Sequence, residues 1–79
     1  MNTILNDSEK SFSAGWNMPG YLPEMEPQYF DQFEEAKAFI YHELNELECP
    51  SEDLQLIFDA AEPFCLQFGD YVYWVDDLS

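Results

Sequence analysis

FDQFEEAKAFIYHELNEL, residues 30 to 47, is the stretch that decides the fold, because its apolar residues recur at the spacing of an α-helix. When successive residues turn by about 100°, one narrow stripe of the helix collects apolar side chains and the other faces collect carboxylates. The apolar stripe consists of Phe33, Ala36, Ile40, Leu44 and Leu47. The pattern predicts an amphipathic helix that buries this stripe in a core and displays negative charge to solvent.

Capping residues mark the ends of this helix. Asp31 stands in an N-cap position with Glu34 three residues later, which is the spacing of a capping box. Pro50 disfavours helical geometry at the residue before it, so we expect the helix to run to about residue 48. The polar face opposite the stripe is expected to gather Asp31, Glu35, His42 and Glu46.

A shorter helix is expected next. Ser51 provides an N-cap, and acidic residues follow it in the first turn. Apolar residues then recur at helical spacing until Pro63, which predicts a helix over residues 52–61. The apolar positions are Leu54, Ile57, Phe58 and Ala61.

The last segment, FCLQFGDYVYWVDDLS, predicts a β-hairpin. Two aromatic and β-branched runs flank a two-residue turn, Gly69-Asp70. The turn fixes the register of the two strands. The expected pairs are Phe68 with Tyr71, Leu66 with Tyr73, Phe64 with Val75 and, on the opposite side of the hairpin, Cys65 with Trp74.

The segments before the long helix complete the expected fold. KSFSAGW, residues 10–16, predicts a strand in which apolar and small polar residues alternate. MPGYLPEMEPQYF, residues 18–30, has three prolines four residues apart and predicts an extended loop rather than a helix or a central strand. We therefore expect residues 1–79 to form one small acidic α+β domain. Its antiparallel sheet, made of the C-terminal hairpin and an N-terminal strand, is covered on one face by one long and one short helix.

The charge of the chain constrains its partners. Seventeen acidic residues face two lysines, Lys10 and Lys37, which gives a formal net charge of −15 and a pI near 4.1. Direct binding to nucleic acid or to an anionic membrane requires many lysines or arginines, so we exclude both partners. A basic protein surface would instead attract the chain by electrostatic steering. The alternative is that the acidity serves solubility alone.

The acidic residues predict a contact surface that resembles a nucleic-acid backbone. Helical carboxylates three or four residues apart lie about 5–6 Å from one another, close to the spacing of successive phosphates. The candidate partner-binding residues are Asp31, Glu35, Glu46, Glu52, Asp53, Asp59, Asp76 and Asp77. The alternative contact is the Pro-rich loop, through Tyr21, Leu22 and Met25.

No catalytic or metal motif accompanies this charge pattern. The single histidine, His42, falls on the predicted outer face of the helix with no nucleophile placed beside it. Cys49 and Cys65 lack the spacing of a zinc site, and we expect both to be small core residues with reduced thiols. We therefore expect no enzymatic activity, no cofactor and no metal. The N-terminus MNTILNDSEK lacks the basic start and apolar run of a signal peptide, so we expect a cytoplasmic protein.

Two segments of the chain, residues 16–47 and 69–78, contain the short motifs Gly20-Tyr21-Leu22-Pro23, Glu26-Pro27, Phe30-Asp31, Phe33-Glu34-Glu35-Ala36 and Tyr71-Val72-Tyr73-Trp74. In these motifs the chain resembles small acidic proteins encoded by bacteriophages and prophages. The resemblance implies a phage origin and the cytoplasm of a host bacterium, but no mechanism, because this group has no established activity. Small acidic phage proteins include anti-CRISPR and anti-restriction inhibitors that occlude DNA-binding surfaces. By analogy of size, charge and origin, we expect a non-enzymatic inhibitor of a nucleic-acid-binding defence protein.

The net charge of −15 predicts that the folded chain is weakened by its own repulsion. Because dissolved ions screen exposed charges, we expect the melting temperature to rise when sodium chloride is increased from low to moderate concentration. Thermal unfolding followed by circular dichroism measures this shift. A melting temperature that falls over the same range of salt would contradict the prediction.

Overall fold

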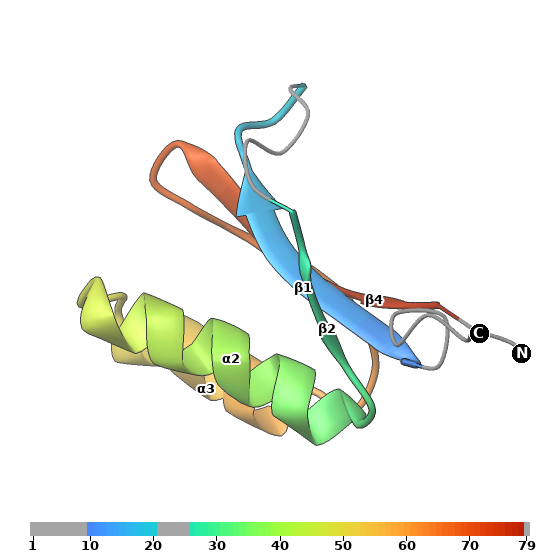
Figure 1. Ribbon diagram of the computed structural model, residues 1–79. Coiled ribbons are helices and arrows are strands. Elements are labelled where there is room, and N and C mark those ends of the chain that lie inside the picture. The colour runs from blue at the N-terminus through green and yellow to red at the C-terminus, as the bar shows by residue number, and fades with distance from the viewer. Residues whose placement is uncertain (1–9, 21–25, 79) are drawn as a thin grey trace, which may run out of the picture.

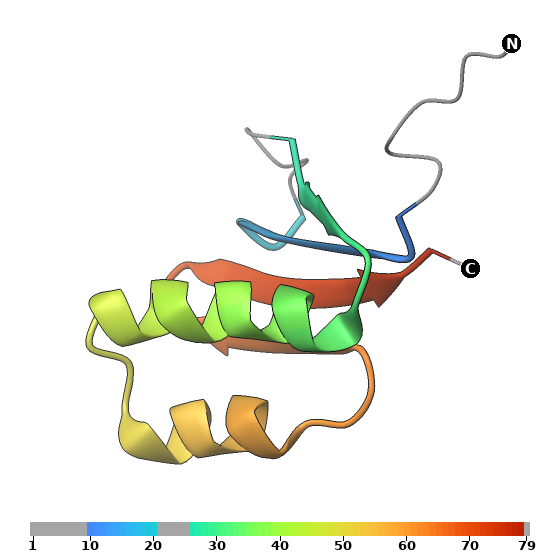
Figure 2. The ribbon, with the colours of Figure 1, turned by 60° about the horizontal axis from the view of Figure 1, so that its bottom comes forward.

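In the described part of the chain, residues 10–20 and 26–78, four antiparallel strands form one sheet and two helices lie against one of its faces (Figure 1 and Figure 2). This arrangement, seen in a computed structural model, confirms the α+β class expected from the sequence. The sheet contains one strand more than expected. In chain order the elements are β1 (Phe12–Asn17), β2 (Gln28–Phe30), α2 (Phe33–Glu46), α3 (Ser51–Asp59), β3 (Phe64–Phe68) and β4 (Tyr71–Asp77).

The sheet has the strand order β2-β1-β4-β3. The segment predicted as an N-terminal strand forms β1, which pairs with β2 on one side and with β4 on the other. The predicted hairpin forms β3 and β4, and all four predicted residue pairs are confirmed. β2 and β3 are therefore the two edges of the sheet.

The hairpin turn explains why its register was readable from the sequence. Gly69 has a φ of 63°, whereas Asp70 does not have a positive φ. Glycine with positive φ at the first of two turn residues is typical of a type II′ turn, whose twist matches that of the flanking strands. The turn therefore fixes Phe68 opposite Tyr71, and every later pair follows from it.

β2 corrects the prediction of an extended loop up to residue 30. Tyr29 and Phe30 instead pair with Ser13 and Phe12 of β1. The three prolines led to the expectation of a loop. A strand forms nevertheless, because Pro27 lies just before it and cannot interrupt its hydrogen bonds. The result is a three-residue edge strand.

The apolar stripe of α2 packs against β1, β2 and β4. Ala36, Ile40 and Leu44 are fully buried, as predicted. Phe33 is half-buried. The prediction was wrong for Leu47, which is 47% exposed because it lies beyond the last turn of the helix.

Aromatic rings fill the space between α2 and the sheet. Trp16 of β1 stacks on Phe39 of α2, with ring centroids 5.7 Å apart, and its centroid lies 5.4 Å from that of Tyr73 in β4. Phe33 contacts Phe12 of β1 and, edge-on, Phe64 of β3. These rings link three strands to one helix and supply large buried areas for a domain of this size.

The start of α2 differs from the prediction by one residue. The N-cap is Gln32 rather than Asp31, and its backbone N–H donates to Oε1 of Glu35 at 3.2 Å. The carboxylate of Asp31 is turned instead toward Lys10, whose Nζ lies 3.4 Å from Oδ1. This contact with Lys10, two residues before β1, occupies the side chain that the sequence suggested as the cap.

The end of α2 also differs, because the helix stops two residues before the predicted boundary. The N–H of Cys49 donates to the carbonyl of Leu44 at 3.0 Å. The N–H of Glu48 donates to the carbonyl of Asn45 at 3.1 Å. These two hydrogen bonds form a Schellman motif, which requires a left-handed residue at Glu48, and its φ is 62°. Glycine usually occupies this position, since a side chain there costs roughly 1–2 kcal/mol.

α3 begins and ends earlier than predicted. Its N-cap is Pro50, without a side-chain hydrogen bond, so Ser51 is the first helical residue rather than the cap. At the other end Ala60 is already extended, and the helix does not continue to residue 61. Ile57 is buried as expected, but Phe58 is 65% exposed and does not belong to the core.

The face of the sheet that the helices do not cover carries Trp74. Its indole lies over Gly15 of β1, where an added Cβ would come within 3.0 Å of the ring, and Nε1 donates to Oδ1 of Asn17 at 2.8 Å. Cys65, opposite Trp74, is exposed on this face, so the expectation of a core residue was wrong. Cys49 is buried, as predicted.

The Schellman motif predicts a stabilising substitution. We expect Glu48→Gly to raise the free energy of unfolding by about 1 kcal/mol, because glycine adopts the left-handed conformation without steric cost. For a domain of this length, the melting temperature should rise by about 4–8 °C. Glu48→Gln is the matched control, since it removes the charge but keeps the strained backbone, and it should gain less. A glycine variant no more stable than the glutamine variant would contradict the strain argument.

Candidate acidic binding surface

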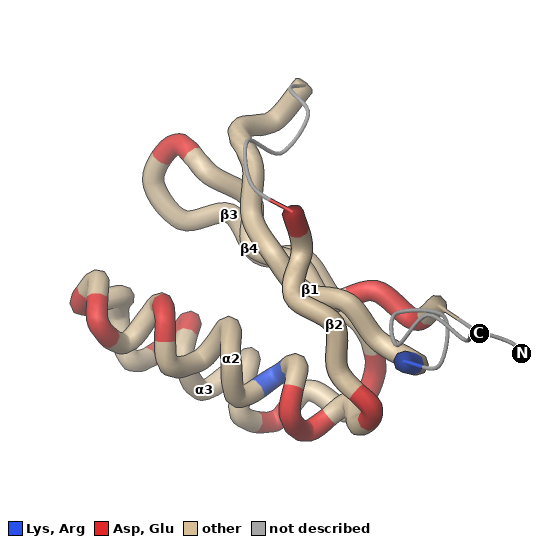
Figure 3. The backbone as a smooth tube through the Cα atoms, viewed as in Figure 1, with Lys and Arg blue, Asp and Glu red and all other residues tan. Residues whose placement is uncertain are grey.

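Most of the described acidic residues lie toward opposite ends of the helical layer (Figure 3). One group, which we call the junction cluster, lies where α2 ends and α3 begins, and consists of Glu43, Glu46, Glu48, Glu52 and Asp53. The second group, which we call the strand-end cluster, lies around the start of α2, the end of α3 and the end of β4. It consists of Asp31, Glu34, Glu35, Asp59, Glu62, Asp76 and Asp77.

The residues proposed from the sequence are therefore divided between two places. Glu46, Glu52 and Asp53 belong to the junction cluster, and the remaining five belong to the strand-end cluster. Glu35 and Glu46 share a helix face, but eleven residues separate them, which is about 16 Å along the axis. The set therefore does not form one continuous row of carboxylates.

Both lysines of the chain lie on the strand-end cluster. Lys10 pairs with Asp31, and Nζ of Lys37 lies 3.5 Å from Oε1 of Glu34. The chain contains no other lysine or arginine. The junction cluster consequently has no lysine or arginine to offset its negative charge.

Several acidic residues of the predicted set also have structural contacts. Glu35 accepts the hydrogen bond from the N–H of the α2 N-cap. Asp59 accepts a hydrogen bond from Nε2 of Gln55 at 3.0 Å, within α3. Substituting Glu35 would therefore disturb the start of α2 as well as the surface charge. Glu46 and Glu52 are exposed, which makes them the better positions for testing a charged contact.

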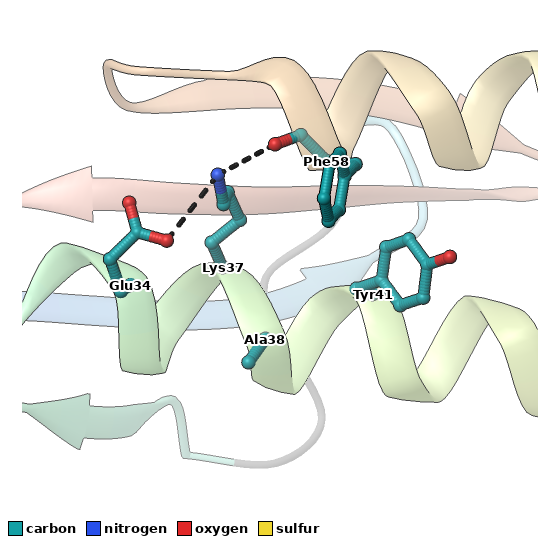
Figure 4. Close-up of a pocket in the computed structure, with 5 residues that line it drawn as sticks. All are labelled: Glu34, Lys37, Ala38, Tyr41 and Phe58. Carbon is teal, nitrogen blue, oxygen red and sulfur yellow. Dashed lines mark hydrogen bonds and ion pairs between the residues drawn. The ribbon is translucent and has the colours of Figure 1, made fainter.

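A groove of about 430 Å³ separates the outer surfaces of α2 and α3 (Figure 4). Lys37 lies at its wall, where Nζ donates to the carbonyl of Phe58 at 2.8 Å and to that of Ala60 at 3.0 Å. This ammonium group stabilises the C-terminal end of α3, where carbonyl groups have no partner within the helix. Because Lys37 is already bound by three acceptors, its role here is to hold the two helices together. The lining residues are Glu34, Lys37, Ala38, Tyr41 and Phe58.

Two buried groups border the junction cluster. Burial raises the pKa of the Cys49 thiol above its ordinary value of 9.0, and the charge of Asp53, whose Oδ2 lies 3.9 Å from Sγ, raises it further. Burial likewise raises the pKa of Tyr73 above 10.0, with the charge of Glu43 adding to the effect. Both groups are neutral at pH 7, and the carboxylates beside them lie at the rim of the apolar core.

The other sequence candidates are placed as follows. His42 is exposed on α2, as predicted. Over residues 10–20 and 26–78, no three histidine, cysteine or acidic side chains lie together in a way that could hold a metal ion. Within the same residues, no helix has the length and apolar character needed to cross a membrane. Tyr21, Leu22 and Met25, the alternative contact, lie outside the described residues.

Sequence reasoning did not include Glu43 and Glu48 in the predicted surface. Their position carried a signal, because carboxylates in the last turn of a helix face the negative end of its dipole and each costs roughly 0.3–1 kcal/mol. The left-handed conformation of Glu48 had no signal in the sequence, since glutamate rarely occupies such a position.

Comparisons with known proteins do not identify a relative. No protein-family model matches the chain, and neither a curated protein nor a solved structure matches it. The resemblance to small acidic phage proteins therefore stays a prediction, and the function is argued from the charge and geometry of the described residues.

The raised pKa values of Cys49 and Tyr73 predict a loss of stability at alkaline pH. A raised pKa means that the folded state holds the proton more tightly than the unfolded state does, so stability is fully present below pH 9.0 and falls as the pH rises through the folded-state pKa values. Urea unfolding measured between neutral and alkaline pH tests this. Cys49→Ala should make the fall shallower, and Cys65→Ala is the matched control for loss of a thiol. An identical pH dependence for wild type and Cys49→Ala would contradict the assignment.

Proposed function

We propose that this protein is a non-enzymatic, phage-type acidic protein that binds a basic surface of a nucleic-acid-binding protein of the host and blocks access of nucleic acid to it. The junction cluster is the contact surface. The observation that carries this proposal is Glu48, a carboxylate held in a left-handed backbone conformation at the negative end of α2.

Two separate local costs apply to Glu48. Its side chain strains the Schellman motif, and its charge faces the negative end of the helix dipole. Glycine would remove the first cost and lysine would reverse the second. Solubility does not require a carboxylate at this position, because other exposed positions accept charge without either cost. A binding role at the junction explains why the charge is placed here.

The arrangement of the junction cluster suits a basic partner. Glu43 and Glu46 are three residues apart on α2, so their Cβ atoms lie about 5–6 Å from each other, similar to neighbouring phosphates. Glu52 and Asp53 add two further charges in the first turn of α3, where the helix dipole favours them. With no lysine at this end of the molecule, the negative potential extends into solvent and steers a basic surface toward it.

Charge reversal at the junction tests the proposal. The tagged protein is incubated with bacterial lysate, and bound proteins are eluted first with competitor DNA and then with high salt before they are identified. We expect wild type to release a nucleic-acid-binding protein into the DNA eluate. The variant carrying Glu46→Lys and Glu52→Lys should retain at least about tenfold less of it, because reversed charges repel a basic surface.

The matched control carries Glu26→Lys and Asp76→Lys, which change the net charge by the same amount away from the junction. We expect it to retain the partner nearly as well as wild type does. Circular dichroism verifies that both variants are folded. Equal loss in both variants would show that only total charge matters, and undiminished binding by the junction variant would reject this surface.

A further inference from the structure

The outer edge of β3 is the feature of the described structure that the junction cluster does not explain. β3 is the last strand of the sheet and pairs with β4 on one side, while none of the described strands pairs with its other side. Its sequence, FCLQF, contains neither charge nor proline. In a chain with seventeen acidic residues, an uncharged edge strand is a distinct surface.

The register shows which backbone groups this edge offers. In a hairpin closed by a two-residue turn, Phe68 and Tyr71 exchange both of their backbone hydrogen bonds, and the pairs then alternate along the strands. The N–H and C=O groups of Cys65 and Gln67 therefore point away from β4. Both residues are exposed, so these donors and acceptors face solvent along the edge.

The two edges of the sheet differ in the length of strand that they expose. β2 has three residues, follows Pro27 and is followed at once by Asp31, and β3 likewise follows a proline, Pro63. Short length, proline and charge are the devices by which proteins prevent further strands from pairing at an edge. Proline flanks both edges, so β3 differs from β2 by its five residues, which offer a longer run of uncharged strand.

Acidic residues flank β3 on both sides, but none lies within the strand. Glu62 precedes the strand and Asp70 occupies the turn after it, and both are exposed. Five residues of strand extend about 16–17 Å. An approaching strand would therefore meet uncharged backbone along its middle and a carboxylate near each end. A second copy of this chain would bring another charge of −15 to the same place and is disfavoured by repulsion.

We propose that the outer edge of β3 binds an extended segment of a basic partner by β-strand addition. The segment has uncharged β-forming residues at its centre and a lysine or arginine at each end, opposite Glu62 and Asp70. Backbone hydrogen bonds to Cys65 and Gln67 supply affinity, and the end charges select the partner. The basic character of the segment rests on the function proposed above, whereas the docking mode rests on the edge itself.

Hydrogen exchange of backbone amides tests this docking mode directly. The probe is the peptide acetyl-Lys-Lys-Val-Thr-Val-Thr-Val-Lys-Lys-amide, added to isotope-labelled protein in an NMR experiment. At a peptide concentration about ten times its dissociation constant, exchange of the Cys65 and Gln67 amides should slow about tenfold. The control peptide, with glutamate in place of every lysine, should leave both amides unprotected.

A backbone variant separates strand pairing from contact with side chains. Gln67→Pro removes an outward N–H that β4 does not use, and proline is tolerated at such edge positions. Gln67→Ala is the matched control, because it keeps the N–H and loses the side chain. We expect the alanine variant to bind the lysine peptide as wild type does and the folded proline variant to bind at least about tenfold more weakly, measured by titration.

Several outcomes would overturn the inference. These are unprotected β3 amides, spectral changes confined to the junction cluster, and protection that appears with protein concentration alone, which would show that a second copy occupies the edge. The two proposals fail separately. If β3 stays unprotected while junction charge reversal abolishes partner capture, the edge inference fails and the proposed function stands. If β3 is protected while the junction variant captures as much partner as wild type, the edge inference stands and the proposed function fails.

Discussion

The packing of α2 on the central strands is the interaction on which the rest of the structure depends. Ala36, Ile40 and Leu44 are fully buried in this contact, and the stacked rings of Trp16 and Phe39 extend it along the helix. The contact must hold the domain together against the repulsion of a net charge of −15. Aromatic side chains suit this task because each buries a large apolar area, and stabilisation by burial is not weakened by like charges on the surface.

The two lysines determine how the charge is distributed. Lys37 bonds the last carbonyls of α3 and pairs with Glu34 of α2, so one side chain fastens the second helix to the first. Lys10 fastens the start of β1 to Asp31. Both lysines therefore pair with residues of the strand-end cluster. As a result, the carboxylates of the junction cluster have no lysine beside them, and their negative charge is not offset by one.

The parts of the fold that were predictable from the sequence are those fixed by local chemistry. The Gly69-Asp70 turn and alternating residues determined the register of the hairpin, and helical spacing identified Ile40 and Leu44 as core. The parts that failed depend on distant contacts. Asp31 was assigned as a cap because its partner, Lys10, is far away in sequence. For Cys65, strict alternation could not say which face of the hairpin the helices would cover.

The candidate site was predictable in composition but not in shape. The sequence identified acidic residues on both helices, yet it could not show that α2 and α3 turn back on each other at a Schellman motif. That turn brings the acids at the end of one helix beside those at the start of the next. The sequence also could not show the steric cost at Glu48, because that cost follows from its left-handed φ of 62°. Separating the acids into two clusters, with the lysines on one, likewise required the packing of the helices.

The distribution of charge, rather than its amount, argues against acidity that serves solubility alone. A chain that used carboxylates only to prevent association would place one in β3, where an uncharged edge strand invites pairing with another chain. It would also avoid Glu48, where a carboxylate costs stability. The structure has the opposite arrangement. It has a carboxylate at Glu48, where the backbone conformation disfavours a side chain, and no charge within the edge strand β3. Both departures are explained if the junction cluster and the β3 edge are surfaces that a basic partner contacts.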